Sequence, residues 1–277
     1  MVDIIKLTKT GQIMQIKFLG QAGILILGKK ATIIIDPYLS NFVVSGGYGS
    51  AELFSRNYLP PILPENLPVI DAVFITHDHA DHCDLDTLKV IAANNPKCFF
   101  IGPAQVREHF KVLEIFRNQL VIPSPKISTM PGNQGIEYCS LPSAHYKIEQ
   151  NLQSGEYECL GYLIRLDDIV LYHSGDTILY NGIVENILKP KWGVDIACLP
   201  VNGRDEKREK LGIVGNLTAH EAVDLALAIN ARVLIPMHND LFSINQEDPE
   251  LVMETFSKVR GIEIKQMAPG ETLLYKN

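Results

Sequence analysis

The segment FITHDHADHCD, residues 74–84, places three histidines and three aspartates directly behind a short apolar run. His77 and His79 are two residues apart at the end of an extended segment, so their rings are expected to project to the same side. Asp81 and His82 follow on the turn that precedes a predicted helix. One short loop could therefore serve two metal ions. The alternative is a polar turn whose histidines only face water.

The composition is that of an ordinary globular protein. With 277 residues, of which 46% are hydrophobic, the chain can bury a substantial core. The formal net charge of −7 argues against a nucleic-acid partner, because phosphates require clustered Lys and Arg. The five cysteines are odd in number and lack CxxC spacing, which argues against a disulfide framework.

The N-terminal sequence MVDIIKLTKTGQ lacks the basic region, apolar region and cleavage site of a signal peptide. No uninterrupted apolar run approaches the length that a membrane-spanning helix needs. We therefore predict a cytoplasmic protein with no membrane partner, and a homo-oligomer is compatible with this prediction.

Short β-branched runs dominate the first part of the chain, and the same order returns later. MQIKFLG, GILILG and ATIIID, within residues 14–36, predict three strands. IEYCSLPSAH, LGYLIRL and DIVLYHSGD, within residues 136–176, repeat this order, and the third run again reaches an aspartate. We predict two related β-rich halves within a single domain that covers residues 1–277.

Helical patterns alternate with further strand patterns near residues 84–94, 103–110 and 178–188. Two more helix starts are well marked. Thr218 and Glu221 form a capping box, and Asp248 with Pro249 opens a helix that Gly261 can close. Strands covered by helices imply a layered α/β protein.

Residues 37–68 fit neither pattern. They contain SGGYGS and YLPPILPENLP, and an irregular segment of this length in a compact domain is usually a functional loop or disordered. We predict a loop over the site.

Three more candidate ligands stand just beyond predicted strands: His145 in LPSAHY, Asp176 in LYHSGDT and His238 in LIPMHND. Taken singly, each residue type in such a place is more often a structural, hydrogen-bonded group. In layered α/β folds, however, strand ends are where sites assemble, so the group as a whole favours one site.

The combination of HxHxDH, a later histidine, SGD and a last strand-end histidine resembles the metallo-β-lactamase superfamily. THDHADH, FIGP, LYHSGD and IPMHNDLFSINQEDP further resemble its L-ascorbate 6-phosphate lactonase branch, over roughly residues 13–270. The resemblance implies an α/β fold, a four-layer αββα sandwich with metals at one edge of the two sheets. The chain departs from the lactonase at residues 238–240, which read HND rather than HHD, and in NGRDEKR, where the lactonase has ENPRG. Substrate contacts come largely from such loops.

By motif, the resemblance implies two metal sites bridged by Asp176, with His77, His79 and His145 at one and Asp81, His82 and His238 at the other. Divalent ions lower the pKa of bound water from about 15.7 to about 7, which a neutral-pH hydrolase without a covalent nucleophile needs. Two ions, two aspartates and a bridging hydroxide leave a formal charge of about +1, which favours an anionic substrate. The nitrogen and oxygen ligands permit Zn²⁺ and also Mn²⁺, and the lactonase resemblance suggests Mn²⁺.

Several residues are candidates for supporting roles. Asp36 in IDPYLS resembles a family position that hydrogen-bonds the metal-binding loop. Arg204 and Arg208 in NGRDEKREK could bind a substrate phosphate or carboxylate, or could belong to a solvated loop of mixed charge. His173 could orient a ligand, although packing is favoured. His109 and His220 lie in predicted helices and are placed outside the site.

These features predict a dinuclear metal-dependent hydrolase in which a metal-bound hydroxide attacks a small anionic substrate, a phosphorylated lactone or a phosphodiester. Asp81 and His238 are the predicted catalytic residues, and Asp81 could also shuttle a proton. A metal-dependent nuclease is an alternative that the acidic charge balance disfavours. A non-catalytic ligand-binding protein on the same fold is another, which intact ligand motifs disfavour.

Overall fold

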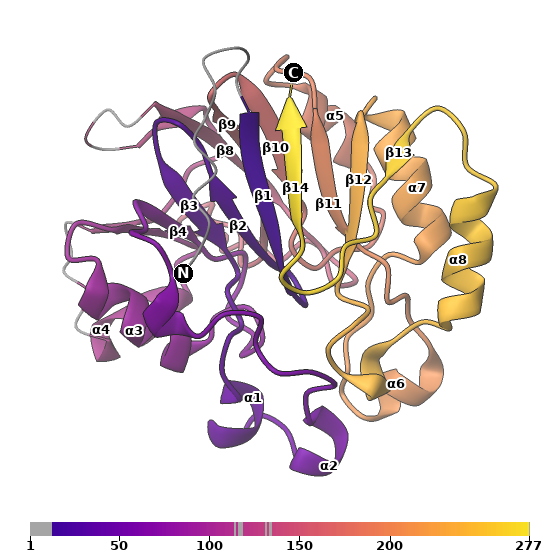
Figure 1. Cartoon of the computed structure of the whole chain (residues 1–277), viewed down its shortest axis with the longest axis horizontal. Helices are drawn as coiled ribbons and strands as arrows, with labels where there is room; N and C mark the ends of the chain where they lie inside the picture. Colours follow the sequence, from indigo (N-terminus) through magenta and orange to yellow (C-terminus); the bar gives the residue numbers. More distant parts are fainter. Residues whose placement is uncertain (1–12, 114, 116–118, 131, 133–134, 277) are drawn as a thin grey trace.

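The computed structural model describes residues 13–113, 115, 119–130, 132 and 135–276. Over these residues, two seven-stranded sheets stack face to face and carry helices on their outer sides (Figure 1). The prediction of an αββα arrangement is confirmed, because two mixed sheets are flanked by helices.

The first sheet has the strand order β14-β1-β2-β3-β4-β5-β6. Its strands are β1 (Ile13–Gly20), β2 (Gly23–Leu27), β3 (Thr32–Ile35), β4 (Ala72–Phe74), β5 (Phe99–Ile101), β6 (Leu120–Val121) and β14 (Thr272–Lys276). β1, β2 and β3 pair antiparallel, and β3 to β6 pair parallel.

The second sheet repeats this plan, with the order β13-β12-β11-β10-β9-β8-β7. Its strands are β7 (Ser128–Thr129), β8 (Ile136–Pro142), β9 (Leu160–Leu166), β10 (Ile169–His173), β11 (Ile196–Pro200), β12 (Val233–Met237) and β13 (Glu263–Ile264). β8, β9 and β10 pair antiparallel, and β10 to β13 pair parallel. The two related halves predicted from the repeated strand order are therefore confirmed.

The main core lies between the two sheets. Ile24 and Ile26 of β2 face into it, where they join side chains of the second sheet such as Tyr162 and Ile164 of β9. Leu25, between the two isoleucines, belongs instead to the outer core under the helices. Because both faces of these strands are covered, the sequence shows continuous apolar runs rather than alternation.

Helices cover the outer face of each sheet. α3 (Leu85–Asn94) and α4 (Val106–Val112) lie on the first sheet, and α5 (Ile183–Leu188), α7 (Ala219–Ala228) and α8 (Pro249–Ser257) lie on the second. Beyond one end of the strands lie α1 (Phe42–Ser45), α2 (Ala51–Phe54) and α6 (Glu206–Lys210) (Figure 1). Two 3₁₀ turns complete the list, η1 (Pro64–Asn66) and η2 (Ser243–Asn245).

The two helix starts marked by capping residues are confirmed, whereas α4 and α5 begin several residues after the predicted starts at 103 and 178. Thr218 and Glu221 form the capping box of α7, and Asp248 accepts a hydrogen bond from the backbone N–H of Glu250 at the start of α8. α8 ends at Ser257, before Gly261 is reached, so the prediction that Gly261 closes this helix is wrong. None of the helices in the described part of the chain combines the length and apolar character needed to cross a membrane.

Candidate metal centre

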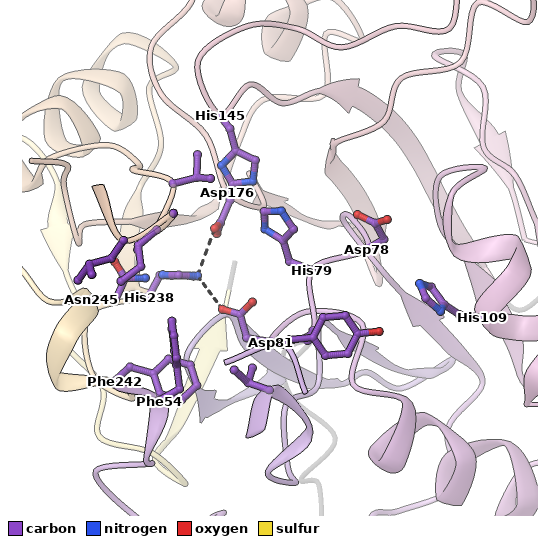
Figure 2. Close-up of a pocket in the computed structure, with 17 residues that line it drawn as sticks. Phe54, Asp78, His79, Asp81, His109, His145, Asp176, His238, Phe242 and Asn245 are labelled. Atoms are coloured by element: carbon purple, nitrogen blue, oxygen red, sulfur yellow. Dashed lines mark ion pairs between the residues drawn. The ribbon is translucent and has the colours of Figure 1, made fainter. Parts of the chain in front are cut away.

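The seven predicted metal ligands lie in loops that follow strands of both sheets. The loop after β4 carries His77, His79, Asp81 and His82, and the loops after β8, β10 and β12 carry His145, Asp176 and His238. Figure 2 shows His79, Asp81, His145, Asp176 and His238 around one space. Neither sheet could assemble this cluster alone.

The candidate ligand atoms form three overlapping groups. In each group, the ligand atoms lie no more than 4.8 Å from one another. The groups are His77, His79 and His145; Asp81, His82 and His238; and His77, His82 and Asp176. Oδ1 of Asp176 is 3.2 Å from Nε2 of His82, and Oδ2 is 3.2 Å from Nε2 of His238. The first two groups coincide with the two sites that the sequence resemblance implies.

Asp36 orients the rings of two of the histidines. Its Oδ2 is 2.8 Å from Nδ1 of His82, so this ring donates from Nδ1 and directs Nε2 toward the cluster. The Thr76 hydroxyl donates to the same carboxylate at 2.5 Å, so it can only accept from Nδ1 of His77, 3.0 Å away. Both rings are thereby prepared to offer Nε2 to a cation. Asp36 therefore lies where the sequence placed it, behind the metal-binding loop.

Some nitrogens of the cluster are buried without a hydrogen-bond partner among the described residues. These atoms are Nε2 of His77, both ring nitrogens of His145 and Nδ1 of His238. An unsatisfied buried polar group costs about 1–3 kcal/mol. A divalent cation would satisfy the first two imidazoles through their lone pairs, and imidazole with carboxylate suits zinc and manganese. The residues present therefore fit a metal site.

Burial and neighbouring charges shift the pKa values of several side chains in the cluster. Burial lowers the pKa of His77, and it lowers the pKa of His145 to about 4. Burial opposes the charge of Asp176 too, but His238 and His82 hold the pKa of this carboxyl well below its usual range. His77 and His145 are thus neutral and Asp176 is ionised, which are the forms that bind metal. Burial also opposes the charge of His82 and His238, but the nearby carboxylates raise the pKa of both imidazoles, so a cation would have to displace their protons.

His145→Gln is expected to flatten the pH dependence of stability of the metal-free protein. The pKa of His145 is about 4 in the folded chain and 6.5 ordinarily, so between these values only the unfolded chain binds the proton. Stability contributed by neutral His145 is therefore lost as the pH falls from 6.5 to 4. Urea unfolding of chelator-treated proteins at pH 7 and pH 4.5 should show a loss about 2 kcal/mol larger in the wild type than in the variant.

The exposed His220 gives the control for this experiment, because its side chain is 77% accessible. His220→Gln should leave the pH dependence as in the wild type. Identical losses in the wild type and His145→Gln would contradict the buried, neutral state of His145.

Gln21, in the turn between β1 and β2, contacts the cluster, although no motif in the sequence marks this residue. Its side-chain N–H donates to Oδ2 of Asp81 at 2.7 Å, and the same Nε2 is 3.0 Å from Nε2 of His238. Its backbone carbonyl accepts from the backbone N–H of His238 at 2.7 Å. Gln21 thus holds Asp81 and His238 at a fixed separation.

His173 is fully buried at the end of β10 and supports the turn that carries Asp176. Its Nε2 lies 2.9 Å from the carbonyl oxygen of Ala22, and its Nδ1 accepts from the backbone N–H of Gly175 at 3.1 Å. Packing was the favoured interpretation of this residue, and these hydrogen bonds add an orienting contact to it.

A cavity of about 480 Å³ opens beside the cluster. Five of the candidate ligands line it, together with the adjacent carboxylate of Asp78: His79, Asp81, His145, Asp176 and His238. The remaining lining residues are Val43, Tyr48, Phe54, Ala80, His109, Leu211, Gly212, Ile213, Val214, Phe242 and Asn245. The 37–68 segment contributes to this wall, as expected of a loop over the site. His109 also reaches the wall, although the sequence had placed it outside.

Asp84 fastens the 37–68 segment to α3. Its carboxylate caps the helix by accepting from the Thr87 backbone N–H at 3.1 Å, and it accepts from Leu39 N, Ser40 N and the Ser40 hydroxyl at 2.7–3.2 Å. Asp84→Ala is expected to lower the free energy of unfolding by about 3 kcal/mol, because it removes a cap and leaves buried donors unsatisfied.

Urea unfolding would measure this loss, and Asp86→Ala is the matched control. Asp86 is exposed on the same helix, and its one side-chain hydrogen bond to Ser45 is also exposed, so its removal should cost less than about 0.5 kcal/mol. Equal effects of the two substitutions would contradict the anchoring role of Asp84.

The structure does not bring the two candidate substrate arginines to the cavity. Arg204 pairs with Glu221, with both N···O distances 2.7 Å, and also donates to the carbonyl oxygen of Asn216. Arg208 is buried and pairs with Asp205. Its guanidinium does not line the cavity, although Nη1 lies 3.3 Å from Oδ1 of Asn245, which does. We therefore leave both arginines out of the site.

Comparisons with known proteins agree with this architecture. The chain is 27% identical over 268 residues to the UPF0173 metal-dependent hydrolase of Thermococcus onnurineus, covering 94% of this chain and 98% of the relative. It is similar in fold to a solved metallo hydrolase of Ignicoccus hospitalis, Igni18, with a TM-score of 0.68, 20% identity and coverage of 96% and 99% of the two chains. An isothiocyanate hydrolase from Delia radicum gut bacteria gives a TM-score of 0.73 at 16% identity, with coverage of 95% and 99%.

The family model described as "Beta-lactamase superfamily domain" matches residues 31–239, which is well over half of the chain. The matched range contains all seven candidate ligands and Asp36. By this match the chain belongs to the metallo-β-lactamase superfamily.

Proposed function

We propose that this protein is a dinuclear metal-dependent hydrolase. The observation that supports the proposal is the convergence of seven candidate ligand side chains, six of them buried or half-buried, with imidazole nitrogens of His77 and His145 left without partners among the described residues. Relatives of this chain, among them the protein of Thermococcus onnurineus, are named as metal-dependent hydrolases, which supports the proposal.

Two divalent ions, Mn²⁺ or Zn²⁺, are proposed as the cofactors. One would be held by His77, His79 and His145, the other by Asp81, His82 and His238, with Asp176 shared between them. When bound, such ions lower the pKa of water and polarise the bond to be cleaved.

The protein's own residues prepare this chemistry. Asp36 and Thr76 orient the rings of His77 and His82, and Gln21 holds one oxygen of Asp81. The side chain of Asp81 is 19% accessible and lines the cavity, so it can take up a proton from the attacking water and release it to solvent. His238 completes the catalytic pair that the sequence predicted.

For the substrate we propose a small lactone or ester. The sequence resemblance to the lactonase branch supports attack at a carbonyl carbon. The loaded cluster would have a formal charge of about +1 and would attract negative charge at the reacting group. A phosphodiester carries such a charge, and an ester acquires it on its carbonyl oxygen during attack. A phosphorylated lactone would carry a second anionic group farther from the ions. No Lys or Arg side chain occurs among the described residues that line the cavity, so this group would have no such partner there.

The test starts from protein stripped with a chelator and reloaded with Mn²⁺ or Zn²⁺. Elemental analysis should find two ions per chain, and an assay panel should show opening of lactones or cleavage of esters that exceeds cleavage of bis(4-nitrophenyl) phosphate. Faster phosphodiester cleavage would overturn the lactone assignment. Fully loaded protein without hydrolysis of any substrate would instead favour a ligand-binding protein.

A nuclease is the less favoured alternative. Counterion release from nucleic acid requires Lys and Arg contacts, and neither residue type occurs among the described residues that line the cavity. The single domain over residues 1–277, the cytoplasmic location, the absence of nucleic-acid and membrane partners, and a homo-oligomer stay predictions.

A further inference from the structure

The cavity wall away from the cluster is built from apolar side chains of three separate segments. The α1–α2 segment supplies Val43, Tyr48 and Phe54, the segment after α6 supplies Leu211, Ile213 and Val214, and Phe242 precedes η2. Phe54 and Phe242 pack edge to face, with ring centroids 5.5 Å apart, on the His238 side of the cavity (Figure 2). Such a wall favours the burial of apolar ligand surface.

The charged groups of the wall do not favour an anion. Outside the candidate ligands, the ionisable lining residues in the described part of the chain are Asp78, His109 and Tyr48. The nearby guanidinium of Arg56 donates to the carbonyl oxygens of Tyr38, Ser40 and Tyr58, and so is held away from the cavity. A carboxylate or phosphate in the outer cavity would therefore lose water without gaining a charged partner, and would lie near Asp78.

We infer that the substrate is a neutral ester or lactone whose aliphatic or aromatic group packs against Phe54, Phe242 and Leu211, an inference that rests on the proposed function. The reacting carbonyl would lie at the cluster, and the cavity volume of about 480 Å³ is within the usual range for small-molecule sites, ~300–1,000 Å³. In the reaction, water adds its oxygen to the carbonyl carbon and the C–O bond to the leaving oxygen breaks. One proton of the water goes to the leaving oxygen, and the other is released to solvent. The products are a carboxylate and an alcohol, or one hydroxy acid from a lactone.

The first test uses metal-loaded protein and 4-nitrophenyl esters from acetate to octanoate. We expect kcat/KM to rise about fourfold for each added methylene until the cavity is filled. 4-Nitrophenyl hemiadipate, which adds a terminal carboxylate to a chain of hexanoate length, should react at least about tenfold more slowly than the hexanoate. A flat series, or a hemiadipate that reacts as fast as the hexanoate, would overturn the inference.

A substitution in the wall tests the same point from the protein side. Leu211→Lys places a cation in the wall at a side chain that is 48% exposed, so the fold should tolerate it. The variant should narrow or reverse the preference for hexanoate over hemiadipate. Leu251→Lys, on α8 and 50% exposed, lies outside the cavity and should leave that preference as in the wild type. Equal behaviour of the two variants would count against the inference.

Binding measured by calorimetry separates this inference from the proposed function. Hexanohydroxamic acid should bind the Zn²⁺-loaded protein at least about tenfold more tightly than acetohydroxamic acid, because both share the chelating group and differ in apolar chain. Leu211→Lys should reduce this ratio. If no ester or lactone is hydrolysed but the ratio holds, the proposed function fails and the apolar selectivity stands. Equal affinities would overturn the selectivity whatever the activity.

Discussion

Asp176→Asn is expected to lower kcat/KM by at least about 10³-fold and to reduce the metal content below two ions per chain. The Asp176 carboxylate lies 3.2 Å from Nε2 of both His82 and His238 and is buried with them. The amide keeps the shape of the side chain but removes its negative charge and turns a donor toward the proposed ions. A loss of about 4 kcal/mol of transition-state stabilisation corresponds to this change in rate.

Asp78→Asn is the matched control for Asp176→Asn. Asp78 belongs to the same loop as His77 and lines the cavity, yet it is exposed and absent from the three ligand groups. Elemental analysis should find the wild-type metal content in this variant, and circular dichroism should show both variants folded. A fully loaded and active Asp176→Asn protein would contradict the bridging role of Asp176.

Removal of the ions is expected to lower the midpoint of thermal unfolding by about 10 °C. An ion present at about 1,000 times its dissociation constant stabilises the folded state by about 4 kcal/mol, and each kcal/mol shifts the midpoint of a chain of this size by about 2–4 °C. The metal-free cluster also retains buried nitrogens without partners. Scanning calorimetry with Mn²⁺ or Zn²⁺, with chelator, and after reloading would measure the shift.

The Asp176→Asn protein separates an effect of the ions from an effect of the chelator. Its midpoint should change much less on chelation, because it would hold fewer ions at the start. An unchanged midpoint in the wild type after elemental analysis has confirmed removal of the metal would show that the cluster is stable without ions.

The ligand cluster could be predicted because its information is local. HxHxDH fixes four ligands on one loop, and His145, Asp176 and His238 each follow an apolar strand that the sequence reveals. Their convergence then follows from the general rule that strand ends meet at one edge of a layered sheet.

Features that depend on tertiary contacts could not be predicted from the sequence. Gln21 contacts Asp81 only because the β1–β2 turn meets a distant loop. Arg204 was a reasonable phosphate ligand by residue type, but its ion pair with Glu221 crosses from one loop to a helix, which spacing cannot reveal. The apolar wall likewise joins Phe54, Leu211 and Phe242 from three distant segments.

β14 shows the same limit for the fold. The sequence TLLYK is too short a pattern to predict a strand by itself, yet residues 272–276 pair with β1 from the other end of the described chain. Its place in the sheet follows from that pairing, with Ile13 opposite Lys276, rather than from its own composition.

The pairing of β1 with β14 has a consequence for biosynthesis. β1 is the first strand of the described chain to be made and β14 is the last, so while the ribosome is still translating, one edge of β1 has no partner strand. β1 acquires its second partner strand only when residues 272–276 have left the exit tunnel. Nascent chains arrested before that point should therefore expose the edge of β1 to chaperones, whereas β14 covers that edge in released chains.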